Sequence, residues 1–212
     1  MAHKLYACMG SGNCFKPWQV MKVLGIPFEL ELVDVLAGAQ KKPDYLAINP
    51  QGVVPYLITE AGSRLGESNA MAWFLAEGSP LMPDTPAARA EALQWMFFEQ
   101  SKLEPFISPA RFFTTVLPDA REERADDIAA WQMSARAGLA HLDQHLSKHD
   151  FIVQSRYTVA DIAVFGYVHV MEEGGLPERD FPHVASWIAR VQNTDGFVPL
   201  AMLGVGPHSA AA

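Results

Sequence analysis

Three side chains with chemical potential lie together near the start of the chain: Ser11, Asn13 and Cys14. Their stretch, "LYACMGSGNCFK" (residues 5–16), is predicted to pass from a strand through a glycine-rich loop into a helix. The free N–H groups of the first helical turn then face the loop, and with a hydroxyl and an amide they suit an anion such as a thiolate. Two simpler interpretations stay open. Ser11 or Asn13 only caps the helix, or Cys14 is itself reactive because a helix N-terminus lowers a thiol pKa.

Two further stretches carry groups suited to binding. In "NPQGVVPYL", Val54-Pro55 leads into an apolar strand, and the residues alone favour a trans bond because only about 5% of X–Pro bonds are cis. In "GESNA", Glu67 and Ser68 open a helix. A serine hydroxyl beside free backbone N–H groups forms a site for a carboxylate, and Glu67 could pair with an ammonium. Taken separately, an ordinary turn and ordinary helix capping explain both stretches.

The elements that position these groups alternate between strand and helix patterns over roughly 78 residues. In chain order they are "KLYAC", "CFKPWQVMKVLG", "PFELELVDV", "KPDYLAINP", "VPYLIT", the turn "AGSRLGES" with a very short strand, and "SNAMAWFLAEG". This β-α-β-α-β-β-α order predicts an α/β domain over residues 1–78.

The pattern then becomes helical. Residues 79–86, "SPLMPDTP", hold three prolines in eight residues and are predicted to be a linker. No convincing strand follows, so residues 87–212 are predicted to form an all-α domain, ending in a loose tail, "GVGPHSAAA". Its longest amphipathic helix lies within residues 122–149. The apolar stripe of that helix is Ile128, Trp131, Ala135, Leu139, Leu142 and Leu146.

The composition limits the classes of partner and the cellular compartment that we expect for this protein. The chain has 212 residues, half of them hydrophobic, and a formal net charge of −8, which disfavours nucleic acid as a partner. Its two cysteines, Cys8 and Cys14, are too few for a disulfide framework and lack Cys-x-x-Cys spacing. The longest apolar run, 162–171, is shorter than the roughly 18 residues of a membrane span, and the start has no leader pattern. We therefore expect a reduced, cytoplasmic protein without a membrane partner.

The chain resembles the cytosolic glutathione transferases over residues 4–197. The stretches that carry the resemblance are "LYACMGSGN", "GIPFELELVDV", "PDYLAINPQGVVPYL", "LGESNAMAWFLAE", "RAEALQWMFFEQ" and "SRYTVADIAVFGYV". The Val-Pro and Glu-Ser elements, in this order and spacing, are the most specific. The resemblance implies a thioredoxin-like α/β domain followed by an all-α helical bundle. It also implies a transferase, typically a detoxification enzyme, with glutathione as co-substrate and neither metal nor resident cofactor.

The resemblance places the catalytic position of the family, which is Tyr, Ser or Cys by subclass, on Ser11. This implies a serine-type, bacterial-like enzyme whose hydroxyl donates to the glutathione thiolate, with Asn13 adding or replacing that hydrogen bond. Tyr6 lies on the preceding strand and is expected in the core, and Cys14 is expected in the helix packing. Gly12 stands near the position where the cysteine-type subclass has its cysteine.

Glutathione contacts follow from the same resemblance. Val54, before a cis Pro55, is implied to pair through its backbone with the cysteinyl part of glutathione. Ser68 and its helix N-terminus are implied to hold the γ-glutamyl carboxylate, and Glu67 the γ-glutamyl ammonium.

The glycyl carboxylate has Gln40 and Lys42 as its nearest candidates. Gly52 stands where some subclasses have a histidine, so one family contact is missing or is supplied from elsewhere.

The co-substrate is expected between the two domains, against the first helices after the linker. Aromatic walls suit a hydrophobic electrophile. The candidates are Trp95, Phe98, Arg111, Phe112 and Phe113. Because aromatic residues at helical spacing are usually core, we expect only about two of them to line a pocket.

Two other functions fit the same residues. One is a glutathione-dependent disulfide or peroxide reductase, and the other is a non-catalytic glutathione-binding protein. The family forms homodimers, so the resemblance implies a homodimer here as well.

Overall fold

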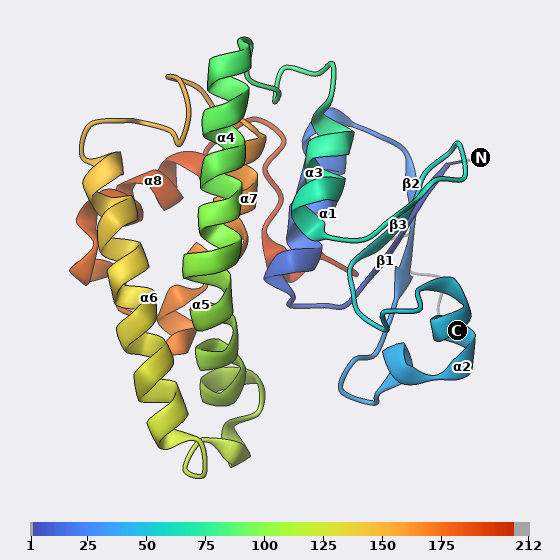
Figure 1. Cartoon of the computed structure of the whole chain (residues 1–212), viewed down its shortest axis with the longest axis horizontal. Helices are drawn as coiled ribbons and strands as arrows, with labels where there is room; N and C mark the ends of the chain where they lie inside the picture. The colour runs from blue at the N-terminus through green and yellow to red at the C-terminus, as the bar shows by residue number, and fades with distance from the viewer. Residues whose placement is uncertain (1, 206–212) are drawn as a thin grey trace. The chain divides into compact units, whose positions relative to one another are not determined.

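The structure is a computed structural model that describes residues 2–205; the end of the expected tail, from residue 206, lies outside them. The elements are β1 (His3–Ala7), α1 (Gly12–Leu24), β2 (Phe28–Leu32), η1 (Ala39–Lys41), α2 (Pro43–Ile48), β3 (Tyr56–Ile58), β4 (Arg64–Leu65), α3 (Ser68–Ala76), α4 (Pro86–Phe98), η2 (Glu99–Leu103), α5 (Glu104–Arg111), η3 (Phe112–Val116), η4 (Pro118–Ala120), α6 (Ala125–Leu146), α7 (Val159–Val168), η5 (Met171–Gly174), η6 (Glu178–Asp180), α8 (Pro182–Gln192) and η7 (Leu200–Met202). Figure 1 labels the main ones. Both the β-α-β-α-β-β-α order and the all-helical second part are as predicted.

The chain divides into two compact units. One comprises the residues up to Ser79 together with the segment from Asp195, and the other is Pro80–Thr194. The division after Ser79 falls at the start of the expected linker. The segment from Asp195, expected with the helical part, belongs instead to the α/β unit.

A four-stranded sheet in the order β2-β1-β3-β4 organises the α/β unit. β1 is parallel to β2 and antiparallel to β3, and β4 is antiparallel to β3. Figure 1 shows α1 and α3 together on one side of the strands and α2 on the other. This is the thioredoxin-like arrangement, and it carries both helix N-termini of interest on the same side of the sheet.

Alternation along β1 and β3 supplies a core on each face of the sheet. Leu5 and Leu57 are paired across the two strands and fully buried. Tyr6 and Tyr56, the next pair, belong to a separate buried cluster with Tyr45 of α2. Tyr6 is therefore a core residue, as expected from its position on the strand.

The segment after Asp195 packs on α1. The backbone N–H of Val198 donates to Oε1 of Gln19, 3.3 Å away, and the ring of Phe197 lies 6.3 Å from that of Phe15. Gln19 is fully buried, so this contact satisfies the amide oxygen of a polar side chain in the core of the unit, whereas Nε2 has no partner among the described residues.

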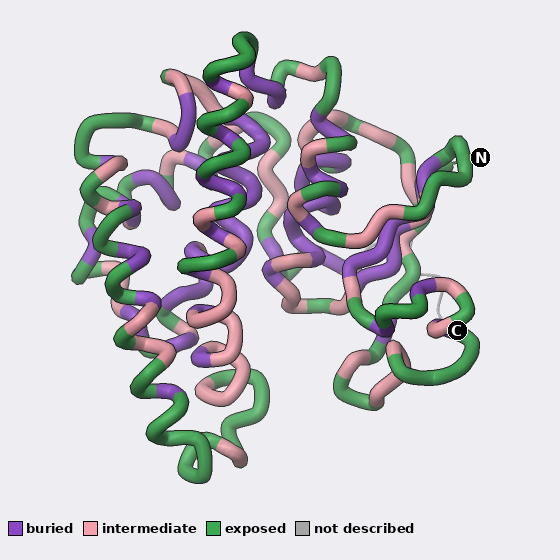
Figure 2. Tube along the Cα trace, viewed as in Figure 1, coloured by how far each residue is buried: buried purple, intermediate pink, exposed green. Residues whose placement is uncertain are grey.

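In the helical unit, the predicted apolar stripe of α6 is buried, except that Trp131 is half-buried. α7 is buried along its whole length, as the continuous purple of its trace in Figure 2 shows. A capping box begins α7. Asp161 there accepts hydrogen bonds from the backbone and hydroxyl of Thr158, the backbone N–H of Ile152 and the Trp187 indole. These contacts give Thr158 and Asp161 a structural role.

Among residues 2–205, no helix combines the length and apolar character needed to cross a membrane.

Candidate functional site

The N-termini of α1 and α3 meet in the α/β unit. The hydroxyl of Ser68, the first residue of α3, donates to Oδ1 of Asn13 in the first turn of α1, at 3.1 Å. Ser68 is buried and Asn13 is half-buried. The two residues are 55 positions apart in the chain. Because each helix N-terminus carries roughly half a positive charge, their meeting creates a place suited to anions.

Ser11 is the N-cap residue of α1. Its Oγ accepts a hydrogen bond from the backbone N–H of Cys14 at 3.2 Å, and its carbonyl accepts from Phe15 at 3.0 Å. The capping interpretation is therefore realised. This capping bond uses an acceptor site of the hydroxyl and not its hydrogen. A serine hydroxyl accepts and donates at once, so Ser11 is able to cap the helix and also donate to a ligand.

Cys14 is fully buried. Burial raises the pKa of the Cys14 thiol well above its usual value, and the neighbouring Cys8 raises it further. The proximity of the helix N-terminus does not overcome these effects. A thiol held in its protonated form is a poor nucleophile, which disfavours Cys14 as the reactive group.

The loop before β3 presents an extended backbone edge. The Val54-Pro55 bond is cis, as the resemblance implies and contrary to the expectation from the residues alone. The Tyr45 hydroxyl and the Asn49 amide both donate to the Val53 carbonyl at 2.8 Å and anchor the loop. Within the described chain, neither the N–H nor the carbonyl of Val54 forms a hydrogen bond, so both are open to an extended peptide.

Glu67 has an unusual backbone, with φ 61° and ψ 112°. A positive φ is rare for a residue with a Cβ and costs on the order of 1–3 kcal/mol, so it persists where the surroundings demand it. Glu67 is exposed and directly precedes Ser68. Glu67 is the N-cap residue of α3, and its side chain forms no capping hydrogen bond. Sequence patterns gave no sign of this strain.

Two candidates for the glycyl carboxylate lie around η1. Gln40 is half-buried, and its Oε1 has no hydrogen-bond partner among residues 2–205, whereas Lys42 is exposed. Gly52 adopts φ +62°, and a Cβ there would lie 2.9 Å from the Gln40 carbonyl and 3.1 Å from Lys41 Nζ. A lysine thus occupies the space beside Gly52, and the sequence analysis did not single it out.

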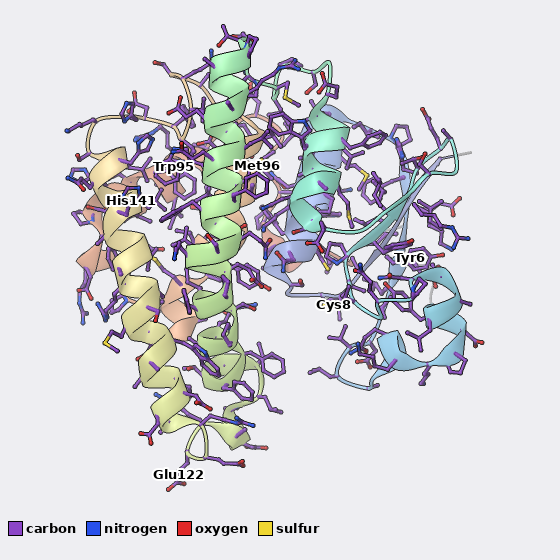
Figure 3. The ribbon with its side chains drawn as sticks, viewed as in Figure 1. Tyr6, Cys8, Trp95, Met96, Glu122 and His141 are labelled. Atoms are coloured by element: carbon purple, nitrogen blue, oxygen red, sulfur yellow. The ribbon has the colours of Figure 1, made fainter. Side chains whose placement is uncertain are left out.

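The five candidates for the electrophile wall separate into groups within the helical unit. Trp95 of α4 is buried, with its ring 5.3 Å from Phe98 and 5.5 Å from His141 of α6. Figure 3 labels Trp95 and His141 side by side between α4 and α6. Trp95 is therefore largely committed to core packing.

Arg111, Phe112 and Phe113 lie around the end of α5. Arg111 forms an ion pair with Glu173 at 2.7 Å, and the Phe113 ring stacks on Trp131 at 5.8 Å. Phe112 and Phe113 belong to η3, a π-helical segment, and such segments are frequent at functional sites. Sequence periodicity predicted neither this π-segment nor η2.

Within the described residues, no group of three or more His, Cys, Asp or Glu side chains could hold a metal ion.

Comparison with known families gives two matches. Residues 10–77 match the model of the glutathione S-transferase N-terminal domain, and residues 119–190 match that of the glutathione S-transferase C-terminal domain. The two matches fall in the α/β part and in the helical part.

Individual relatives agree. Glutathione S-transferase 3 of Zea mays is 32% identical over 197 residues, covering 87% of this chain and 86% of the relative. A crystal structure of a glutathione S-transferase from Pseudomonas fluorescens is 38% identical, with a TM-score of 0.90 over 94% of this chain and 99% of its own. A glutathione transferase from Burkholderia graminis, crystallised with two glutathione molecules per subunit, is 27% identical, with a TM-score of 0.81 over 92% and 85%.

Proposed function

The chain belongs to the glutathione S-transferase family, and on this premise we propose that its α/β unit binds glutathione and holds the thiol as a thiolate. Members of this family use glutathione as a substrate and not as a resident cofactor. The observation that carries the proposal is the hydrogen bond from Ser68 to Asn13, which joins the N-termini of α1 and α3. We propose that the Ser11 hydroxyl donates a hydrogen bond to the thiolate. The side-chain amide of Asn13 is proposed as a second donor.

The energetics of thiolate formation support this assignment. A free thiol has a pKa of about 8.5, and lowering it by about 2 units requires about 2.7 kcal/mol. A hydrogen bond to a charged group supplies about 1.5–3 kcal/mol. A helix N-terminus adds about 0.3–1 kcal/mol. One hydroxyl donor at the start of α1 is thus sufficient, and the serine acts as a donor and not as a nucleophile.

We propose that the rest of the glutathione tripeptide contacts residues near the N-termini of α1 and α3. Val54 offers its open N–H and carbonyl to the cysteinyl backbone, in strand-like pairing before Pro55. Ser68 and the first N–H groups of α3 receive the γ-glutamyl carboxylate, and Glu67 receives the ammonium. The Ser68 hydroxyl donates a hydrogen bond to Oδ1 of Asn13 in this structure. We expect this hydroxyl to turn toward the γ-glutamyl carboxylate when glutathione binds.

The glycyl carboxylate is assigned to the surroundings of η1. Gln40 and Lys42 remain the proposed contacts, and Lys41 joins them because its Nζ lies beside Gly52. A cation at this position takes the place of the histidine that some subclasses have.

The electrophile is proposed to be small and hydrophobic. Phe112 and Arg111 at the end of α5 are the favoured wall, because η3 there is a π-helical segment and such segments are frequent at functional sites. Trp95 and Phe98 of α4 form a separate aromatic pair and remain proposed contacts of the electrophile. The homodimer, the cytoplasmic location and the detoxifying role are proposals that rest on the resemblance alone.

The direct test is retention on immobilised glutathione, followed by assay. Wild-type protein should be retained, elute with free glutathione, and conjugate glutathione to an aryl halide faster than it reduces a mixed disulfide. Ser68→Ala should bind glutathione about 10-fold more weakly, which corresponds to about 1.4 kcal/mol. Ser63→Ala, in the turn between β3 and β4, is the matched control and should bind normally. Equal binding by both variants would refute the assignment of Ser68.

A further inference from the structure

The two cysteines of the chain meet across the loop that carries Ser11. Cys8 follows β1, and Cys14 lies in the first turn of α1. The backbone N–H of Cys8 donates to Sγ of Cys14 at 3.4 Å, and the neighbouring Cys8 thiol raises the pKa of Cys14. Neither cysteine is in a disulfide. No role proposed above uses them, and their separation in sequence does not follow the usual dithiol motif.

The two thiols differ in access. Cys14 is fully buried, whereas Cys8 is half-buried at the end of β1, where Figure 3 labels it. A reagent from solvent therefore reaches Cys8 before Cys14, and the Cys14 sulfur already lies 3.4 Å from the backbone nitrogen of Cys8. This combination of an accessible thiol with an enclosed neighbour is what attack and resolution of a mixed disulfide require.

We propose that Cys8 and Cys14 are a redox-active dithiol that a small disulfide, in particular glutathione disulfide, converts to an intramolecular disulfide. The Cys8 thiolate attacks one sulfur of glutathione disulfide, the S–S bond breaks, and one glutathione leaves. The Cys14 thiolate then attacks the Cys8 sulfur and releases the second glutathione. Two protein thiols lose two electrons and two protons, and one glutathione disulfide becomes two glutathione thiols. The choice of oxidant rests on the proposed function, whereas the pairing of the two thiols does not.

The structure predicts the order and pH dependence of the two steps. Because burial and the neighbouring thiol raise the pKa of Cys14, its attack is the slower step and accelerates as pH rises. The bridge would close around Ser11, which lies midway between the cysteines. The oxidation state of the pair thus acts on the loop that holds the proposed catalytic hydroxyl.

The experiment exposes the full chain to glutathione disulfide and, separately, to hydroxyethyl disulfide. Remaining thiols are alkylated in denaturant, and the protein is weighed by mass spectrometry. Both cysteines lie between Lys4 and Lys22, so a bridge within one peptide appears as a loss of two hydrogens. Cys14→Ala and Cys8→Ala separate the two roles. The double variant Cys8→Ala/Cys14→Ala contains no cysteine and is the matched control.

We expect the wild-type chain to lose both thiols with either oxidant and to retain no adduct. Cys14→Ala should keep one adduct on Cys8, and Cys8→Ala should keep its thiol. Wild-type chain that keeps both thiols, or a stable adduct on Cys8, would overturn the dithiol even if a single variant failed to fold. If hydroxyethyl disulfide formed the bridge and glutathione disulfide did not, the dithiol would stand and only glutathione disulfide as its oxidant would be refuted. Calorimetric glutathione binding by the double variant tests the proposed function independently.

Discussion

Replacement of Ser11 separates helix capping from thiolate stabilisation. Its Oγ accepts from the Cys14 N–H at 3.2 Å, and this bond does not use the hydroxyl hydrogen. Ser11→Ala removes both functions. Ser11→Asn and Ser11→Asp both restore an N-cap oxygen, because Asn and Asp cap helices about as well as Ser. Only Asn also donates a hydrogen, whereas ionised Asp accepts only and repels a thiolate. The Asn and Asp variants are therefore a matched pair.

The expected size of the effect follows from the single donor. Loss of about 1.5–3 kcal/mol of charge-assisted hydrogen bonding raises the thiol pKa by about 1–2 units. If the bound thiol of the wild type titrates near 6.5, Ser11→Ala lowers the ionised fraction at pH 6.5 by about 5- to 50-fold. Loss of the cap lowers the free energy of unfolding by about 1 kcal/mol. Glutathione affinity should change little, because the peptide contacts lie elsewhere.

The assay is the pH dependence of kcat/KM with an aryl halide, measured beside urea unfolding. Ser11→Ala should move the inflection upward by about 1–2 units. Ser11→Asn and Ser11→Asp should unfold at similar urea concentrations, but only the Asp variant should lose turnover. Equal turnover in the Asn and Asp variants, or an unmoved inflection in Ser11→Ala, would refute a role for the hydroxyl beyond capping.

Three further predictions concern other parts of the chain. Glu67→Gln should weaken glutathione binding about 10-fold in calorimetry, because a charged hydrogen bond becomes a neutral one, while Glu60→Gln, outside the site, should bind normally. Asp161→Ala should lower the free energy of unfolding in urea by about 3–5 kcal/mol, because four buried donor groups lose their acceptor. A loss below about 1 kcal/mol would contradict the structural role of the capping box. Burial, assisted by Arg111, lowers the pKa of His169 to about 4, so the unfolded state binds a proton first and stability is lost as pH falls from about 6.5 toward 4. His169→Phe should remove about 2 kcal/mol of this loss at pH 5. If the free energies of unfolding of the wild type and the variant differed by the same amount at every pH, the role of His169 would be contradicted.

Local patterns predicted the elements well, for identifiable reasons. The short apolar run "KLYAC" predicted a strand, and Leu5 and Tyr6 within it are buried on β1. The stripe that includes Leu139 and Leu142 marked one face of α6, and that face is buried. The first helix starts at Gly12 rather than at Cys14, because its N-cap is Ser11 and not a later residue.

Features set by distant contacts were not predictable from the residues alone. The hydrogen bond between Ser68 and Asn13 joins residues 55 positions apart, and no local pattern encodes it. The positive φ of Glu67 is imposed by the fold on a residue that disfavours it. The cis Val54-Pro55 bond required the family resemblance, because Val-Pro alone is usually trans.

Two further features depend on packing. The segment from Asp195 carries no strong periodicity, and it joins the α/β unit through Val198 and Phe197 on α1. Cys8 and Cys14 contact each other because the loop turns the chain from strand to helix, although their spacing is not that of a redox motif.

The most direct test of the central claim is titration of the glutathione thiol in the complex. Ultraviolet difference spectra of wild-type protein with and without glutathione report the thiolate as pH rises. The bound thiol should titrate about 2 units below its value of about 8.5 in solution, with S-methylglutathione as the spectroscopically silent control. A bound thiol that titrates at its solution value would contradict the claim that Ser11 and the N-terminus of α1 ionise it.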